Sequence, residues 1–540
     1  MHKLLFILLL LSNILNAQNY NRPIPPFFPN YEFEINELSY LGYYFAHAYR
    51  QTPGTKSNMF VLDSMGYVAW YRKNQDKTTL DFKYHEGSNK FSFIGFNQEL
   101  GSVFKTLDTN FQRVDTLTAE STSGIMEYGD SHDFLMLSNG NKIIGTRYDT
   151  IMDLSGYIFN GTLGEPNIPV RGFGIQEFDS ENNLIWRWRS TDFIHPEEFL
   201  DDLFSYNTSA FSYAHGNSIA LDLDSNLIIS LRHTSAIYKI NRVERTGEVI
   251  WRLGGEQSSF DIPQDSTFSG QHYARVLPNG NIGIFDNGNH RIDPEYSRAS
   301  EYELNFADST ATLVWSYDED KSVYSASTGN AQWLNDDLVL VSWGSVLRPE
   351  PTFSLVNLSG DILTRLHYED TYVSYRIQAY ELPFELPRPQ LTYNFSNDSV
   401  VINAPSGHAE YVWSTGETTP SIKVPTNGVY QVWVPHGIGM IGSYPLDATS
   451  VIVGDNEPSL KSFKIFPNPA TDHFQIEIEF NKFTEFNMEL YDSSGKKIKE
   501  FKGRNHFIRQ SINSSSFPNG FYFLKVKTEM GVFTKRIILL

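Results

Sequence analysis

Short apolar runs recur along most of the chain, and in several places a two-residue polar turn divides one run from the next. Asn139-Gly140 and Asn279-Gly280 each divide such a pair of runs, and Asp224-Ser225 marks a weaker copy. Both central positions of an Asn-Gly turn favour positive φ, which is the geometry of a tight hairpin. The pattern therefore predicts a series of β-hairpins.

A second recurring pattern is an extended run that ends in tryptophan, at Trp70, Trp186, Trp251 and Trp315. The last three of these residues lie 65 and 64 residues apart, and the interval before Trp186 has room for two such units. Two hairpins per repeat, closed by an aromatic residue, are typical of a four-stranded propeller blade. The sequence predicts an all-β fold with a six-bladed β-propeller over residues 18–380, and a pair of β-sandwiches is the alternative.

The propeller region is followed by two smaller segments. Residues 381–389 are rich in proline and are interpreted as a linker. Short strand patterns in residues 390–455 predict a small immunoglobulin-like β-sandwich, and residues 463–540 predict a C-terminal β-sandwich.

Composition and charge exclude several classes of function. The 540 residues include 63 acidic and 43 basic side chains, a net charge of −20 that repels nucleic-acid phosphates. The chain contains no cysteine, which excludes disulfides, thiolate nucleophiles, cysteine zinc sites and iron–sulfur clusters. We expect no nucleic-acid partner.

The N-terminus has the pattern of a secretory signal peptide. Lys3 precedes an apolar run over residues 4–11, and a small residue, Ala17, follows at the expected cleavage position. A buried N-terminal strand is the alternative. No later run is long enough to cross a bilayer, so residues 1–17 predict an exported protein without a membrane span.

Three histidines occupy the same place in the repeat, at or just before the strand that leads into the polar turn. They are His132, His215 and His272, and Arg232 with His233 follows the second of them. Equivalent positions in different blades converge on the propeller axis. We therefore expect these side chains to meet at the mouth of the central channel.

Convergent imidazoles and a guanidinium have a specific chemical use. A neutral imidazole is a nucleophile, and further imidazoles with an arginine hold a multi-oxygen anion and stabilise the charge that develops on it. These residue types favour sulfuryl or phosphoryl transfer. Two alternatives remain open: three histidines that bind zinc with an open fourth position, and histidines that are hydrogen-bonded core residues.

Residues 125–345 resemble the bacterial arylsulfate sulfotransferases, which are periplasmic or secreted six-bladed propellers. The resemblance rests on an ordered series of motifs: His132-Asp133, Asn139-Gly140-Asn141, His215-Gly216-Asn217-Ser218, Leu231-Arg232-His233, Gly254-Gly255, Gln271-His272, Phe285-Asp286-Asn287-Gly288 and Ser297-Arg298-Ala299. Residues 40–125 match the family poorly, and the disulfide of enteric members is absent.

The resemblance implies a ping-pong transfer of sulfate from a phenolic sulfate ester to a phenol, without phosphoadenosine phosphosulfate or any other cofactor. His272 would be the nucleophile that becomes sulfated on nitrogen. His132, His215 and Arg232 would bind the sulfuryl oxygens, and one imidazole would give or take the phenolic proton. In the same way, Asn217 would add a hydrogen-bond donor to the same oxygens, and Thr328 matches a substrate-binding loop of the family more loosely. No metal is implied.

Residues 463–540 resemble the C-terminal sorting domain of the type nine secretion system of Bacteroidetes. The resemblance rests on the opening Pro467-Asn468-Pro469-Ala470 and on the basic, apolar end that begins at Lys535-Arg536. It implies recognition by the type nine secretion machinery, export through the periplasm to the cell surface or medium, and removal of the segment.

Three hypotheses for function follow. The leading one is an aryl sulfotransferase with an aryl sulfate donor and a phenolic acceptor as partners. A metal-dependent hydrolase or lyase that uses the histidines is the second, and it predicts loss of activity with a chelator. A non-catalytic secreted propeller that binds a ligand is the third, and it predicts that His272→Asn leaves ligand binding intact.

Overall fold

The computed structural model describes residues 22–50, 57–73, 79–122, 124–200, 208, 211–369, 371–396, 399–425, 428–448, 460–492, 496–528 and 531–539. The expected signal peptide, residues 1–17, lies outside these residues. No helix in the described part of the chain has the length and apolar character needed to span a membrane.

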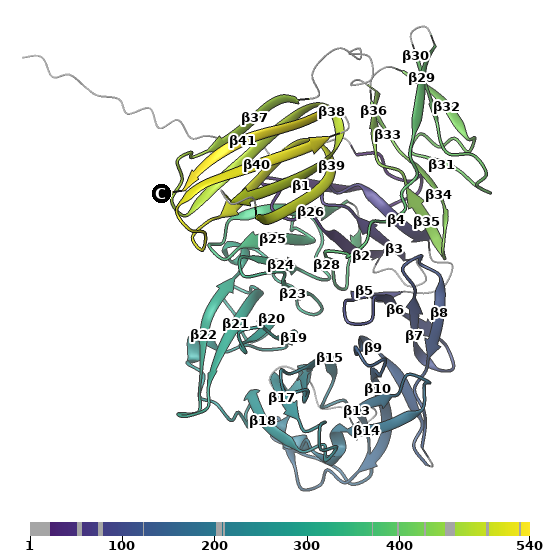
Figure 1. Cartoon of the computed structure of the whole chain (residues 1–540). Helices are drawn as coiled ribbons and strands as arrows, with labels where there is room; N and C mark the ends of the chain where they lie inside the picture. Colours follow the sequence, from purple (N-terminus) through teal and green to yellow (C-terminus); the bar gives the residue numbers. More distant parts are fainter. Residues whose placement is uncertain are drawn as a thin grey trace, which may run out of the picture.

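Most of the strands form four-stranded antiparallel sheets around a common centre, as in a β-propeller (Figure 1). From the centre outward, the first sheet is β28 (Gln378–Tyr380), β2 (Tyr43–Arg50), β3 (Asn58–Leu62) and β4 (Val68–Lys73), with β27 (Tyr372–Val373) also on β2. The second is β5 (Leu80–His85), β6 (Lys90–Asn97), β7 (Gly101–Leu107) and β8 (Arg113–Leu117). The third is β9 (Glu127–Met136), β10 (Lys142–Met152), β13 (Ile168–Phe178) and β14 (Leu184–Arg189), joined to β7 by a single residue pair.

The remaining propeller sheets follow in chain order. They are β15 (Gly216–Leu221), β16 (Leu227–Leu231), β17 (Ala236–Ile240) and β18 (Val249–Gly254); β19 (His272–Val276), β20 (Ile282–Asp286), β21 (Arg298–Asn305) and β22 (Thr310–Tyr317); and β23 (Asn330–Trp333), β24 (Leu338–Ser342), β25 (Phe353–Asn357) and β26 (Ile362–Tyr368). The loops hold the small hairpin β11 (Ile158–Phe159) and β12 (Thr162–Leu163), and the 3-10 helices η1 (Ser190–Asp192), η2 (Pro196–Glu198), η3 (Arg232–Thr234), η4 (Gln264–Ser266) and η5 (Glu319–Lys321). The all-β propeller fold expected from the sequence is confirmed.

The predicted turns and tryptophans take regular places in these sheets. Gly140 and Gly280 both have a φ of 88°, and their turns join the two innermost strands of a sheet, β9 to β10 and β19 to β20. Trp186, Trp251 and Trp315 lie in β14, β18 and β22, each the outermost strand of its sheet. The repeated spacing of the tryptophans is therefore the length of one blade.

Both ends of the propeller region close the ring. Near its N-terminal end, β1 (Tyr31–Ile35) pairs with β26 as the outer edge of the last sheet, and buries Phe33 in the core. At its C-terminal end, β28 becomes the innermost strand of the first sheet. The first and last sheets are therefore each completed by a strand from the far end of the region.

Residues 392–447 form two small sheets beside the first blade. One sheet is β29 (Thr392–Ser396), β30 (Ser399–Asn403) and β32 (Ser421–Pro425); the other is β31 (Val412–Trp413), β34 (Val432–His436) and β35 (Gly439–Gly442), while β33 (Val429–Tyr430) pairs with β36 (Leu446–Asp447). β35 pairs with β4, so the second sheet continues the first blade. Arg388 anchors the proline-rich segment, with Nη1 2.6 Å from Asp63 Oδ2 and Nε 2.9 Å from Gly442 O.

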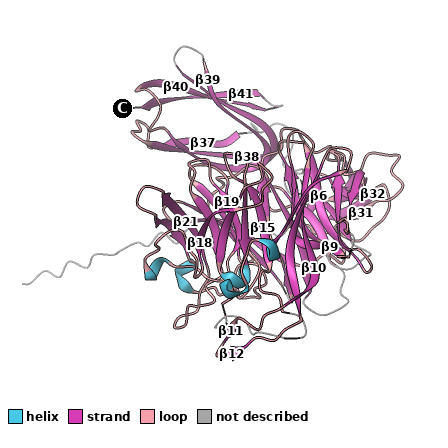
Figure 2. Cartoon of the chain, turned by 90° about the horizontal axis from the view of Figure 1, so that it is seen from below, coloured by secondary structure: helices cyan, strands magenta, loops and turns pink. Residues whose placement is uncertain are grey.

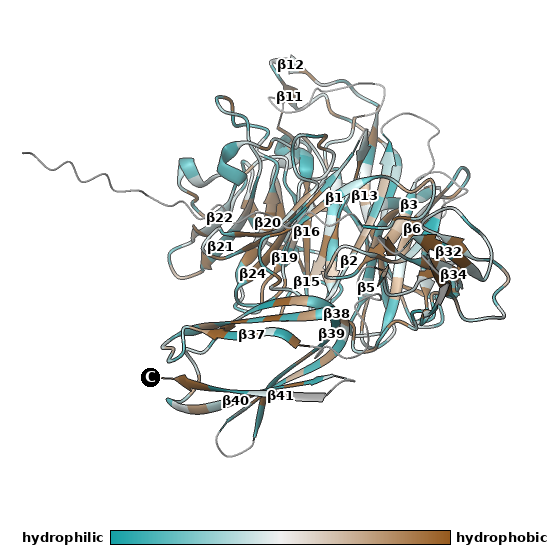
Figure 3. Ribbon diagram, turned by 90° about the horizontal axis from the view of Figure 1, so that it is seen from above, coloured by the Kyte–Doolittle hydropathy of each residue, from teal (hydrophilic) through white to brown (hydrophobic). Residues whose placement is uncertain are grey.

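The C-terminal strands form a separate sheet with its own apolar core. They are β37 (Leu460–Phe466), β38 (His473–Asp492), β39 (Lys497–Asn513), β40 (Gly520–Thr528) and β41 (Gly531–Leu539). This sheet contacts the turn between β3 and β4, where Asn505 Nδ2 donates to Met65 Sδ at 3.1 Å and Phe483 packs edge-on against Tyr67. Figures 2 and 3 show it on one side of the propeller, with the β11–β12 hairpin on the other.

Candidate active site

The three histidines that the repeat predicts to converge lie on, or directly before, the inner strands of three consecutive blades. His215 directly precedes β15, His272 is the first residue of β19, and His132 lies within β9. The strand register shifts at each place: in β9 opposite β10, in β15 beside Gly216, and in β19 between His272 and Arg275. Such bulges turn side chains out of the regular ladder and are frequent beside active sites.

His272 is held as a neutral imidazole. Its Nδ1 lies 2.7 Å from Asn287 Oδ1 and 3.2 Å from Gly270 O, and both atoms are acceptors. Nδ1 therefore carries the proton, while Nε2 accepts a 3.2 Å hydrogen bond from the Thr328 N–H. Burial, reinforced by the charge of Arg232, holds the pKa of His272 well below its usual range. The lone pair of the neutral ring is therefore on Nε2, where it accepts the hydrogen bond from Thr328.

Asn287 follows β20 and is fully buried. Its Nδ2 donates to Ser325 O at 2.8 Å and to Thr328 O at 3.0 Å. Two carbonyl acceptors require the amide nitrogen, so the amide oxygen is the atom that faces His272. One side chain thus connects the imidazole to the loop that carries Thr328.

Thr328 holds its backbone N–H against His272 in a strained conformation. Its φ is 69°, a region that β-branched residues rarely adopt. The Ser345 N–H donates to Thr328 Oγ1 at 3.0 Å, and a Cβ on Gly344 would lie 2.3 Å from the same oxygen. This close packing stabilises the strained loop, and strained backbone is concentrated at functional sites.

The other imidazoles lie beside one another. The rings of His132 and His215 meet edge-on with centroids 5.2 Å apart, and those of His215 and His233 stack at 4.6 Å. Burial is the main cause of the low pKa values of two of these rings. The pKa of His215 lies far below its usual range, and that of His233 is lowered to about 4. His132 has a carboxylate partner, with Nδ1 2.6 Å from Asp130 Oδ1.

Arg232 brings a positive charge to the same place. It opens η3, the 3-10 helix after β16, and its Nη2 donates to Ala326 O at 2.9 Å in the loop that precedes Thr328. Its charge contributes to the low pKa of both His215 and His272. Arg232 and the three predicted histidines are therefore brought together as expected.

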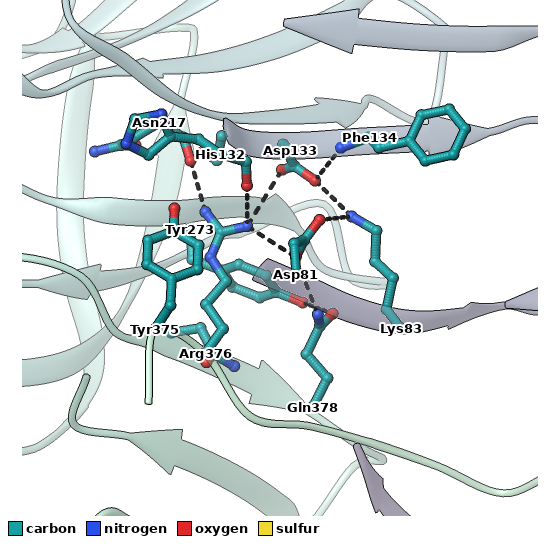
Figure 4. Close-up of polar contacts among 12 residues, drawn as sticks. Asp81, Lys83, His132, Asp133, Phe134, Asn217, Tyr273, Tyr375, Arg376 and Gln378 are labelled. Atoms are coloured by element: carbon teal, nitrogen blue, oxygen red, sulfur yellow. Dashed lines mark hydrogen bonds and ion pairs between the residues drawn. The ribbon is translucent and has the colours of Figure 1, made fainter. Parts of the chain in front are cut away.

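A second arginine, Arg376, lies at the centre of the ring and was not expected from the sequence (Figure 4). Its side chain is fully buried, and it donates to His132 O at 2.8 Å, to Asn217 O at 2.6 Å and to Asp81 Oδ1 at 3.2 Å. It comes from the segment between β27 and β28 that closes the ring. Arg376 thus ties the closing segment to the strands that carry the histidines.

Arg376 belongs to a buried network of charges. Lys83 Nζ lies 2.6 Å from both Asp81 Oδ2 and Asp133 Oδ1, and Arg275 Nη2 lies 2.9 Å from Asp133 Oδ2. The neighbouring cations outweigh burial and hold the pKa of Asp133 well below its usual range. Three cations against two carboxylates leave one excess positive charge next to the imidazoles.

Asn217 lies beside the site with its amide already engaged. Its Nδ2 donates to Gln271 O at 2.7 Å, which assigns the amide orientation. Among the described residues, its buried Oδ1 has no hydrogen-bond partner. The atom that this side chain leaves open is therefore an acceptor, whereas the resemblance implied a donor to sulfuryl oxygens.

Within the described residues, no group of three or more histidine or acidic side chains has a metal-binding arrangement. A large groove, about 2030 Å³, lies between the segment around residues 381–390 and the C-terminal sheet. It contains none of the convergent histidines.

Comparison with known families agrees with this geometry. The model of the arylsulfotransferase (ASST) family matches residues 34–381, more than half of the chain. The chain belongs to the arylsulfotransferase family. The match includes the N-terminal blades that resemble the family least in their motifs.

A second family model, the secretion system C-terminal sorting domain, matches residues 464–540 of this arylsulfotransferase family member. The C-terminal sheet is therefore a type nine sorting domain, which directs export to the cell surface or medium. The predicted sorting segment is confirmed.

No curated protein matches the chain. Similar solved structures include a protein of unknown function from Bacteroides caccae, with 10% identity over 62% of this chain and 98% of that one and a TM-score of 0.37. TolB from Acinetobacter baumannii has 11% identity over 62% and 67%, with a TM-score of 0.32. A catalytically inactive virginiamycin B lyase from Staphylococcus aureus, with quinupristin, has 9% identity over 69% and 96%, also with a TM-score of 0.32.

Several residues of the site were missed or left without a role by sequence reasoning. Asn287 lies in a polar stretch of the sequence, residues 285–290. It directly follows a strand that pairs with the strand of His272, and this position could have predicted its contact with the imidazole. Asp130 lies two residues before His132, and this short spacing could have predicted a contact between its carboxylate and the imidazole. No motif in the sequence surrounds Arg376. It reaches the site only because the C-terminal segment of the propeller closes the ring, and a local pattern does not predict that closure.

Proposed function

We propose that this site transfers a sulfuryl group from a phenolic sulfate ester to a phenol in two half-reactions, through a sulfated His272 and without phosphoadenosine phosphosulfate. The observation that carries the proposal is the state of His272. It is buried and neutral, Asn287 holds the proton on Nδ1, and Nε2 has a lone pair beside the Thr328 N–H.

In the first half-reaction, His272 Nε2 attacks the sulfur of the ester. The N–S bond forms while the bond between sulfur and the phenolic oxygen breaks, and its electron pair leaves with that oxygen. Arg232 stabilises the charge on the sulfuryl oxygens, with His215 beside it. The Thr328 N–H is released from Nε2 when that nitrogen bonds to sulfur, and it becomes a further donor to the same oxygens. The protonated form of His132, oriented by Asp130, gives its Nε2 proton to the departing phenolate and becomes neutral.

The second half-reaction is the reverse with a different phenol. His132 takes the phenolic proton, the phenolic oxygen attacks the sulfur, and the electron pair of the N–S bond returns to His272 Nε2. The site regains its starting protonation state, so the cycle consumes no proton and requires no cofactor.

The local charge supports an anionic ester as the substrate. The chain as a whole carries a net charge of −20, yet the groups that meet at the channel include the neutral imidazoles of His215 and His272, the cation Arg232 and the buried cation Arg376. A sulfate ester is a monoanion, and a cationic site in an acidic protein binds it by Coulomb attraction strengthened by burial.

The test uses the full-length chain with a chromogenic aryl sulfate, with and without excess phenol and without phosphoadenosine phosphosulfate. We expect phenol-dependent release, and a donor-treated sample without acceptor that carries one sulfuryl group on His272 by mass spectrometry. His272→Asn should lower the rate by at least about 10³-fold, since it removes the nucleophile. His408→Asn, far from the site, is the matched control and should leave the rate unchanged.

Other outcomes identify the alternative functions. Release that does not depend on phenol indicates a hydrolase, and inhibition by a chelator indicates a metal-dependent one. Absence of release with several donors, with aryl sulfate binding still detected by calorimetry in wild type and in His272→Asn, indicates a ligand-binding propeller.

A further inference from the structure

The two imidazoles to which the proposed function gives chemical roles have different partners on Nδ1. His272 donates to the neutral amide of Asn287 at 2.7 Å, whereas His132 faces the carboxylate of Asp130 at 2.6 Å. A carboxylate beside an imidazole favours the protonated ring, while an amide orients the ring without adding charge. The nucleophile therefore has the partner that does not raise its basicity.

The Asn287 amide cannot rotate without losing hydrogen bonds. Its nitrogen is committed to Ser325 O and Thr328 O, so its oxygen must face His272. The preceding residue, Asp286, anchors the segment through Arg298, whose Nε lies 3.0 Å from Asp286 Oδ2. This oxygen is thus a preorganised acceptor for one hydrogen on one imidazole nitrogen.

We propose that Asn287 is a positioning residue that keeps His272 in the Nδ1–H tautomer and, because it is neutral, keeps the sulfated imidazole reactive. The inference rests on the proposed function and assigns Asn287 a role in both half-reactions. In the first, the tautomer presents the Nε2 lone pair to sulfur. In the second, the ring must leave sulfur as a neutral imidazole.

The reactivity argument follows from the charge of the intermediate. When Nε2 is bonded to sulfur and Nδ1 keeps its hydrogen, the ring carries a positive charge. Cleavage of the N–S bond returns the electron pair to the ring and removes that charge. A carboxylate in place of the Asn287 amide would stabilise the charged ring and so raise the barrier to transfer onto the phenol.

The groups that face His272 from neighbouring elements are consistent with a neutral ring. They are Arg232 on η3, His132 on β9, His215 before β15 and Arg376 before β28. Each of these is a cation or an imidazole, so each disfavours a positive ring. A new carboxylate at position 287 would therefore have a marked effect on the protonation of His272.

The test compares Asn287→Asp with Asn287→Leu in the full-length chain. Both variants lose the two hydrogen bonds to Ser325 O and Thr328 O, but only aspartate keeps an acceptor for the Nδ1 hydrogen and adds a charge. For Asn287→Asp we expect the acid limb of the kcat/KM profile to move to higher pH by at least about one unit, since the carboxylate favours the imidazolium. We also expect desulfation of His272 by phenol to slow by at least about tenfold.

For Asn287→Leu we expect sulfation of His272 to slow by at least about 100-fold, because the tautomer is no longer selected. Equal effects of the two variants on both half-reactions would overturn the proposal and reduce Asn287 to an anchor for the Thr328 loop. Asn289→Asp is the control for charge, since Asn289 contacts Tyr324 and Ala326 and not the imidazole.

The tautomer itself is measured without substrate by NMR of ¹⁵N-histidine-labelled protein, with His272→Asn used to assign the signal. We expect the His272 hydrogen on Nδ1 in wild type, and a mixture of the Nδ1–H and Nε2–H tautomers in Asn287→Leu. A hydrogen on Nε2 in wild type would overturn the proposal. If wild type shows the Nδ1–H tautomer but never becomes sulfated, the proposed function fails. If His272 is sulfated and the two variants do not differ, only this inference fails.

Discussion

At the scale of single residues, Asp130 identifies the imidazole suited to move protons. Its carboxylate lies 2.6 Å from His132 Nδ1, and its Oδ1 also accepts the His132 backbone N–H at 3.0 Å. The ring is therefore oriented by an anion, which is the usual arrangement for an imidazole that alternates between acid and base. For His215 and His233, burial is the main influence on the ring and keeps both neutral.

This role predicts a dependence on the leaving group. Asp130→Asn should slow transfer from phenyl sulfate by about tenfold or more, because a basic phenolate needs a proton as it leaves. Nitrophenyl sulfate, whose phenolate is a weak base, should be affected much less. The measurement is kcat/KM for both donors. The control is Asp149→Asn, since Asp149 on β10 forms an exposed ion pair with Arg171 on β13. Equal slowing for both donors would contradict the assignment.

The residues of the site differ in how far the sequence could predict them. His132, His215 and His272 were predictable because the repeat places them at equivalent positions, and equivalent positions of a propeller share its axis. Asn287, the partner that sets the tautomer of His272, could not be predicted as such, since a hydrogen bond between neighbouring strands depends on their register and bulges. Arg376 was out of reach because its hydrogen-bond partners Asn217, His132 and Asp81 lie 159, 244 and 295 positions away in the chain.

At the scale of elements, the segment that closes the ring depends on a neutral histidine. The Tyr375 N–H donates to His47 Nε2 at 2.9 Å, which joins β2 to the segment that carries Arg376. A protonated imidazole cannot accept that hydrogen bond. Burial, reinforced by the charge of Arg376, lowers the pKa of His47 to about 3.

Acid should therefore weaken the closure of the ring. In the unfolded chain His47 takes up a proton as the pH falls below about 6.5, whereas in the folded chain it stays neutral to about pH 3. Each such histidine lowers the free energy of unfolding by about 1.4 kcal/mol per pH unit in that interval. His47→Gln, which retains an acceptor, should reduce the pH dependence of urea unfolding between pH 6 and 4 by about one proton. His408→Gln should leave it unchanged, and an unchanged slope in His47→Gln would contradict the argument.

The elements themselves were largely predictable, and their long-range pairings were not. Asn-Gly turns and terminal tryptophans are local signals, and they identified the hairpins and the outer strands. The pairing of β1 with β26 and of β35 with β4 joins segments more than 300 residues apart. No local pattern encodes such a partner, so the continuous sheet between the first blade and residues 412–442 could not be expected.

At the scale of the whole molecule, the site and the sorting domain lie at opposite ends of the propeller. The inner strand β28 begins just after Arg376 and ends at Tyr380, which pairs with Tyr43. The sorting domain contacts Met65 and Tyr67, in the turn at the Tyr43 end of the first blade. In Figure 2 the helices, drawn in cyan, lie on the side away from the sorting domain.

This arrangement predicts that the sorting domain does not inhibit the enzyme. A chain that ends at residue 459 should retain the kcat/KM of the full-length chain within about twofold, since the contacts described for the removed strands lie at Met65 and Tyr67, at the far end of the first blade from the site. Stability should fall, because Met65 and Tyr67 lose their cover and expose apolar area to water. The measurements are the donor kinetics and the thermal midpoint of both chains.

A loss of more than about tenfold in kcat/KM with an unchanged midpoint would show that the sorting domain supports the site directly. A gain of the same size would show instead that it restrains the enzyme until export is complete.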